Sequence, residues 1–264
     1  MPPPIIACFA GEPVRAVQPA GAKDRPGDDV MERRTLVFVV CSPLPRVGKT
    51  LLARLLMEFF LADGRHVAAF DLNPDNHALA EQRSDHATMA NVDDTKAQMA
   101  LFDRLVVADE ITKVVDVGDR CFDQFFAVMA DIGFAGEARR RGIVPVVLFI
   151  ADADRRSLQA YAALQARFPG LTIAPVLNAG AADMRFRNEF RARFPVTPLQ
   201  IPFLSPAAKS LAAQFGYAPG IGGGRSAHAA NELQAWKRRL FLQFREFELR
   251  LLLEELKPAL QLRA

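Results

Sequence analysis

Short, continuously apolar runs alternate along the chain with longer segments in which apolar residues recur every three or four positions. The short runs are rich in β-branched residues and cover residues 35–41, 66–71, 111–117, 143–150, 171–177 and 197–201. Runs that are apolar at nearly every position are typical of strands buried on both faces of a parallel sheet. Because these runs alternate with helical patterns, the sequence predicts right-handed βαβ crossovers. The expected fold is a doubly wound, mainly parallel α/β sheet with helices on both faces.

The segment after the first run is expected to form an amphipathic helix. Its apolar stripe runs from Leu51 to Phe59, and Gly64 stands where the helix should end. A second amphipathic pattern, from Ala230 to Lys257, predicts a long final helix. Its polar face mixes basic and acidic residues, which disfavours a membrane anchor and favours packing on the core or on a partner subunit.

Composition divides the chain into four parts. Residues 1–30 are rich in Pro, Gly, Ala and Asp, so we expect a disordered leader, with Met31 as a candidate true start. Residues 31–215 hold the predicted α/β domain, residues 216–229 form a glycine-rich linker, and residues 230–264 hold the final helix.

Charge and cysteine content narrow the class of protein. The chain has 264 residues, half of them hydrophobic, and a net charge of +3, which does not by itself demand a nucleic acid or membrane partner. Its three cysteines are Cys8, Cys41 and Cys121, an odd number without a C-x-x-C pair. No run is long enough to span a membrane, and no signal peptide is indicated. These features predict a cytoplasmic protein.

Candidate chemistry lies where the first strand gives way to the first helix. A short loop there ends in Gly48-Lys49-Thr50. Such a loop points backbone N–H groups at phosphates, while the lysine reaches the β- and γ-phosphates and the threonine hydroxyl ligates Mg²⁺. Pro43 stands where the usual spacing asks for glycine, and Pro45 removes a second backbone donor. The N–H groups from Arg46 onward would therefore hold the phosphates.

Two further strands end in an acid. Asp71 closes the second run, and Asp116 closes the third with Gly118 just beyond it. Ligands of open α/β sheets bind at the carboxyl ends of parallel strands. A carboxylate there can hold Mg²⁺ directly or through water. The sequence therefore predicts a nucleotide site with a metal ion at this edge.

Three motifs, taken in order, resemble those of the ParA/MinD family of P-loop ATPases. Residues 44–50 correspond to the family's loop Lys-Gly-Gly-x-Gly-Lys-Thr. Residues 71–74 correspond to Asp-x-Asp-Pro, and residues 116–118 correspond to the family's strand that ends in Asp. The resemblance runs from Thr35 to Pro206, and the short interval before Ile111 is similar to compact plasmid partition or transfer members. It implies ATP and Mg²⁺ as cofactors. It also implies an ATP-dependent homodimer with slow hydrolysis that acts in DNA partition, DNA transfer or cellular positioning.

The resemblance also implies roles for individual residues. The phosphate loop would consist of Pro45, Arg46, Val47, Gly48, Lys49, Thr50 and Leu51. Thr50, Asp71 and Asp116 would hold the metal ion or its waters, and Asn73 would orient the attacking water. The remaining implied contacts are Gly118 near the γ-phosphate, Asn178 at the base, and Pro202 in the segment that closes the base pocket.

Departures from the family pattern fall on residues that matter for hydrolysis. Leu44 stands where the family has a lysine that reaches the partner's nucleotide. Arg46, at a position that is normally glycine, could neutralise phosphate in cis or in trans, or simply face solvent. Asn73 stands where the family has an acid; an amide can orient a water but cannot take its proton. Asp75 is near enough in sequence to substitute for that acid.

Two other functions remain open from the sequence. One is an ATP-dependent ligase of the dethiobiotin-synthetase-like type, and the other is a degenerate adaptor that does not hydrolyse nucleotide. Arg187 and Arg191 share one face of an expected helix, which is either a solvated face or a site for non-specific DNA binding.

Overall fold

The computed structural model describes residues 34–261 apart from residues 75–76, 195–197 and 216–226. Their centre is a seven-stranded sheet of order β3-β2-β4-β1-β5-β6-β7, in which every neighbouring pair is parallel. The strands are β1 Leu36–Cys41, β2 Val67–Leu72, β3 Ala87–Met89, β4 Thr112–Val117, β5 Val144–Ile150, β6 Thr172–Asn178 and β7 Leu199–Ile201. The predicted doubly wound parallel sheet is confirmed. The predicted leader, residues 1–30, and the stretch 216–226 of the expected linker lie outside the described residues.

The six runs predicted as strands each overlap one strand of the sheet, with ends that agree within two residues. The seventh strand, β3, was not predicted. It has three residues, two of them exposed, and lies at the edge of the sheet beside β2. Such a short edge strand carries no continuous apolar run, so the sequence pattern gave no signal for it.

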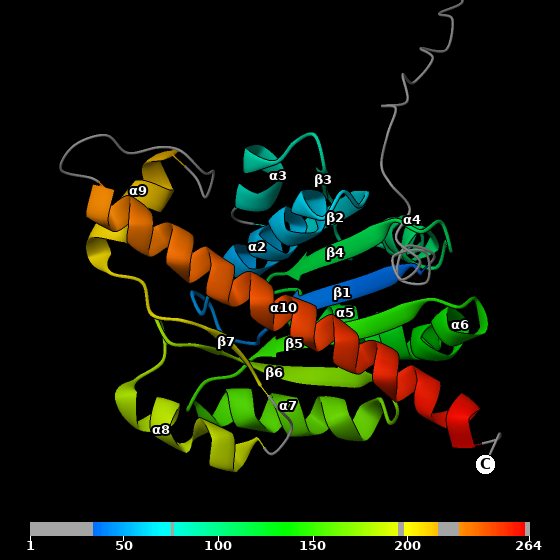
Figure 1. The fold of residues 1–264 in the computed structure, drawn as a ribbon. Coiled ribbons are helices and arrows are strands. Elements are labelled where there is room, and N and C mark those ends of the chain that lie inside the picture. The colour runs from blue at the N-terminus through cyan, green and yellow to red at the C-terminus, as the bar shows by residue number, and fades with distance from the viewer. Residues whose placement is uncertain (1–33, 75–76, 195–197, 216–226, 262–264) are drawn as a thin grey trace, which may run out of the picture.

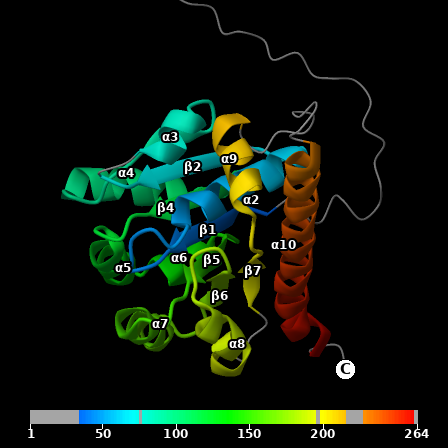
Figure 2. The same cartoon turned by 90° about the vertical axis from the view of Figure 1, so that its left-hand side faces the viewer.

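Helices cover both faces of the sheet (Figures 1 and 2). One face carries α2 Lys49–Ala62, α3 Ala78–Gln82, α9 Pro206–Phe215 and α10 Ala227–Gln261. The other face carries α4 Thr95–Leu105, α5 Phe122–Asp131, α6 Phe134–Arg140, α7 Arg155–Arg167 and α8 Met184–Arg193. Each layer of helices shares one apolar cluster with the strand residues that point toward it. This is why the central strands β4, β1 and β5 are buried at nearly every position.

The long helix α10 lies across the face of the sheet beside α2 (Figure 1). It begins at Ala227, three residues before the predicted start at Ala230, and the end of the expected linker is therefore helical. Its buried apolar stripe consists of Leu233, Trp236, Leu240, Phe244, Phe247 and Leu251. Buried Glu248 accepts two hydrogen bonds from Arg65, at 2.7 and 3.2 Å. None of the described helices is long and apolar enough to cross a membrane.

Candidate functional site

The carboxyl ends of β1, β2 and β4 bring three predicted elements of the site together. The loop from Ser42 to Gly48 follows β1, which lies beside β4 near the centre of the sheet. Asp71 of β2 is directly opposite Asp116 of β4 in the parallel register. The two acids, 45 positions apart in sequence, are therefore neighbours because the strands pair in this register.

The loop turns into α2 through two residues with left-handed backbone conformations. Arg46 has φ 60° and Gly48 has φ 103°. A Cβ atom at position 48 would lie 2.4 Å from Nδ2 of Asn178, so glycine is required there by both the conformation and the close approach. The same Nδ2 donates a hydrogen bond of 2.8 Å to the carbonyl oxygen of Val47. Asn178 therefore fastens the loop, a role that the expected contact with a base did not include.

Lys49, the first residue of α2, is buried although it is charged, with 6% of its surface exposed. Its Nζ donates to the carbonyl oxygen of Leu44 at 2.6 Å and lies 3.4 Å from Oδ1 of Asp119. A buried ammonium with one carbonyl and one partly exposed carboxylate is incompletely compensated. Asp119 was not predicted as a site residue. It could have been predicted from its position, because it follows Gly118 directly at the end of the strand that carries Asp116.

Asp71 is fully buried and accepts four hydrogen bonds. Oδ1 accepts from the backbone N–H of Asn73 at 3.1 Å and from its Nδ2 at 3.0 Å. Oδ2 accepts from the backbone N–H groups of Leu79 and Ala80 at 3.0 and 3.2 Å. Asp71 therefore also holds the first turn of α3, since these N–H groups have no partner inside the helix.

Asp116 is fully buried and has one oxygen without a partner. Its Oδ2 accepts from Nδ2 of Asn73 at 3.0 Å, whereas Oδ1 has no hydrogen-bond partner among the described residues. The pKa of Asp116 is raised to about 7, mainly by burial and to a smaller extent by the charge of Asp71. Thr50, Lys49 and Asn73 act in the opposite direction. An unsatisfied buried carboxylate oxygen is costly and indicates a missing ligand.

The donor set suits Mg²⁺ held partly by a ligand's phosphates. Among the described residues, no group of three or more His, Cys, Asp or Glu residues could hold a metal ion by itself. Mg²⁺ usually takes one or two protein carboxylates and completes its shell with phosphate oxygens and water. The free oxygen of Asp116, together with Thr50 in the adjoining cleft, fits that requirement.

Two cavities adjoin this edge of the sheet. The first, a cleft of about 630 Å³, is lined by Pro45, Arg46, Gly48, Lys49, Thr50, Leu51, Asn73, Pro74, Gly118, Asp119 and Arg120. The second, of about 300 Å³, is lined by residues that include Asn178, Gly180, Pro202, Lys209 and Trp236. Arg46 and Leu51 line both cavities. In the first turn of α2 and the end of the loop, the N–H groups of Gly48, Lys49 and Thr50 have no acceptor in the described part of the chain.

The structure thus gathers most of the predicted site residues at one edge. Val47 lies within the loop, where its carbonyl oxygen is bound by Asn178. Gly118 lies against Asn73, because an added Cβ would be 2.8 Å from Oδ1 of that residue. Asp75 lies outside the described residues.

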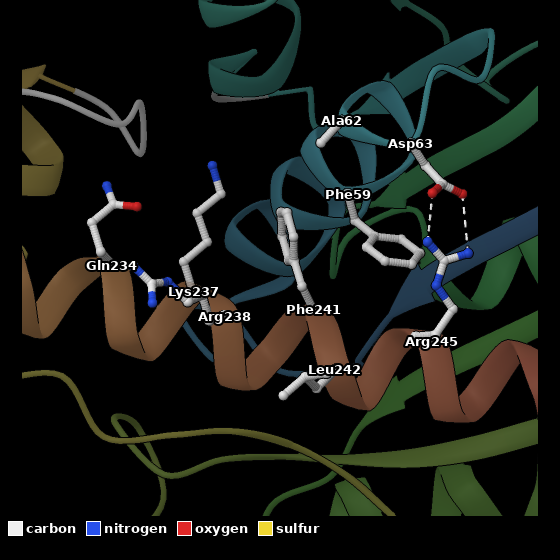
Figure 3. A pocket seen from close by; sticks show the side chains of 9 residues that line it. All are labelled: Phe59, Ala62, Asp63, Gln234, Lys237, Arg238, Phe241, Leu242 and Arg245. Atoms are coloured by element: carbon white, nitrogen blue, oxygen red, sulfur yellow. Dashed lines mark hydrogen bonds and ion pairs between the residues drawn. The ribbon is translucent and has the colours of Figure 1, made fainter. Parts of the chain in front are cut away.

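A third cavity, of about 520 Å³, lies between α2 and α10 and contains none of the predicted site residues (Figure 3). Phe59 of α2 and Phe241 of α10 meet edge to face in it, with ring centroids 5.3 Å apart. Arg245 pairs with Asp63 across it. This groove is part of the packing between the two helices.

Comparison with known proteins finds likeness in structure but not in sequence. No protein-family model matches the sequence, and no curated protein matches it. The fold is similar to that of a solved ParA family ATPase from Chlorobium tepidum TLS. The match has a TM-score of 0.48 and 14% sequence identity, and it covers 78% of this chain and 98% of that chain. A likeness at this level does not extend to ligand or activity.

Proposed function

We propose that this chain binds ATP with Mg²⁺ at the carboxyl edge of the sheet and acts as a ParA/MinD-like switch. The observation that carries the proposal is the presence of two incompletely compensated buried groups close to one cleft: Lys49 lines it, and Asp116 is hydrogen-bonded to Asn73, which also lines it. The Lys49 ammonium is buried beside the cleft with few partners, and Oδ1 of Asp116 is buried with none. A triphosphate with its metal ion would supply an anion for the first and a cation for the second.

In this proposal the larger cavity would hold the phosphates and the metal ion, and the smaller cavity would hold the base. The N–H groups of Gly48, Lys49 and Thr50 would donate hydrogen bonds to the phosphates at the N-terminus of α2. Asp116 and Thr50 hold the metal ion, which when bound would neutralise charge on the phosphates. The smaller cavity beside Asn178 and Pro202 would take the base.

Hydrolysis in such a site would be slow. Nδ2 of Asn73 is bound to two carboxylates, so only its carbonyl oxygen is left to accept from a water. This oxygen can orient a water but cannot remove its proton. Because hydrolysis is slow, the ATP-bound homodimer would be long-lived. It could then act as a cytoplasmic switch in DNA partition, DNA transfer or cellular positioning.

Calorimetric titration with MgATP and MgADP tests binding, and light scattering after size exclusion tests the dimer. We expect Lys49→Ala to lose nucleotide affinity and the dimer formed with a non-hydrolysable ATP analogue. Lys96→Ala, an exposed lysine on α4, is the matched control and should behave as the wild type. Absence of binding by the folded wild type would overturn the proposal in favour of an adaptor. Turnover that requires a small carboxylate or amine would favour a ligase.

A further inference from the structure

The two cavities of the proposed site meet at a residue whose role the proposed function leaves open. Arg46 and Leu51 are the lining residues that the two cavities have in common. A nucleotide with its phosphates in the larger cavity and its base in the smaller one would pass between them. The part of a nucleotide that joins base and terminal phosphates is the ribose with its α-phosphate.

We infer that Arg46 binds the α- and β-phosphates of a nucleoside di- or triphosphate in cis, as a clamp at the junction of the two cavities. The inference rests on the proposed function and assigns a contact within that site. An arginine guanidinium is suited to this position because it is always charged and donates up to five hydrogen bonds to phosphate oxygens.

The surroundings of Arg46 support this contact. The side chain is exposed, and its guanidinium has no hydrogen-bond or ion-pair partner in the described part of the chain. Arg54, the other arginine at the smaller cavity, is bound to Glu58 and Gln82 and is therefore occupied. Arg46 lines the cavities of its own chain, which favours a contact in cis over one across a dimer.

The backbone at Arg46 is held in a conformation that costs energy. Its φ of 60° lies in the left-handed region, which glycine adopts freely and residues with a Cβ do not. Asn178 fixes the loop immediately after it through the carbonyl oxygen of Val47. The loop therefore fixes the backbone at Arg46, so that only the side chain has to be ordered when a ligand binds.

The location predicts a pattern of affinities that differs between Arg46 and Lys49. Arg46→Ala should raise the dissociation constants of ADP and ATP by the same factor, about 10- to 100-fold for one lost charged contact. Lys49→Ala should weaken ATP more than ADP, because the lysine of such loops reaches the γ-phosphate as well as the β-phosphate. Arg46→Lys should recover part of the affinity, and Arg155→Ala, an exposed arginine on α7, should have no effect.

A second pair of variants separates the side chain from the loop's conformation. Arg46→Gly and Arg46→Ala both remove the guanidinium, but only glycine relieves the left-handed strain. Without nucleotide, Arg46→Gly should melt about 2–4 °C above Arg46→Ala. Both variants should lose nucleotide affinity to the same extent.

Calorimetry with MgADP and MgATP, at protein concentrations where the chain is monomeric, decides between the outcomes. Equal losses for both nucleotides in both variants support the clamp. If the wild type binds and Arg46→Ala binds equally well, or if Arg46→Gly restores wild-type affinity, the inference is wrong although the proposed function stands. Loss confined to the ATP-bound dimer would show a contact in trans and would also overturn it. A wild type that binds neither nucleotide would instead refute the proposed function.

Discussion

Replacing Asn73 by aspartate should destabilise the metal-free protein and strengthen its binding of Mg²⁺. Nδ2 of Asn73 donates to Oδ1 of Asp71 and to Oδ2 of Asp116, each at 3.0 Å. Carboxylates only accept hydrogen bonds, so the amide NH₂ is what keeps two buried acids side by side. Asn73→Asp would remove both donors and place a third carboxylate against the first two.

The structure sets the size of this effect. A hydrogen bond to a charged group contributes about 1.5–3 kcal/mol, and the two here join a partly buried amide to two buried carboxylates. Because one of the three acids can take up a proton, part of the loss is recovered, and we expect a net loss of about 3 kcal/mol at neutral pH. For a chain of this size that corresponds to a melting temperature lower by about 6–12 °C.

Thermal melts in EDTA and in MgCl₂ would measure the effect. Asn73→Ala is the control, because it removes both donors without adding charge and should therefore fall between the wild type and Asn73→Asp in EDTA. Mg²⁺ should raise the melting temperature of Asn73→Asp more than that of either other protein. A melting temperature for Asn73→Asp in EDTA equal to that of the wild type would refute the reasoning, as would an equal response of all three proteins to Mg²⁺.

Three further predictions concern the loop, the buried acid and the tryptophan. Gly48→Ala should cost about 2 kcal/mol or more in urea unfolding, since its Cβ would meet Asn178 at 2.4 Å and φ is 103°; a loss below that of an ordinary surface substitution would contradict it. The pKa of Asp116 is about 7 in the folded protein and 3.8 in the unfolded chain. The protonated side chain therefore contributes stability that is fully present below pH 3.8 and is lost as the pH rises through 7. Relative to Asp116→Asn in EDTA, the wild type should therefore lose about 2–3 kcal/mol between about pH 5 and pH 8, and parallel pH profiles would show the pKa is not raised. Trp236 is the single tryptophan and lines the smaller cavity while its indole N–H donates to the carbonyl of Pro202, so nucleotide should change its fluorescence; an unchanged spectrum at saturation would place the base elsewhere.

The sequence by itself determined the class of fold and the edge of the sheet at which the candidate site lies. Short continuous apolar runs predict strands of a parallel sheet, because such strands are buried on both faces. The short edge strand β3 escaped this reasoning, since only one of its three residues is buried. Gly48-Lys49-Thr50 and the strand-end acids could be recognised because their spacing is local or tied to strand ends.

Only the tertiary structure decided what these residues do to one another. Sequence order says nothing about the register that sets Asp71 opposite Asp116, or about the amide of Asn73 between them. It also could not show that Asn178, 131 positions away, binds the loop at Val47 and fills the space beside Gly48. Local patterns fix secondary structure because their interactions span a few residues. The pairing of buried polar groups depends on strand order and register, which the whole core decides.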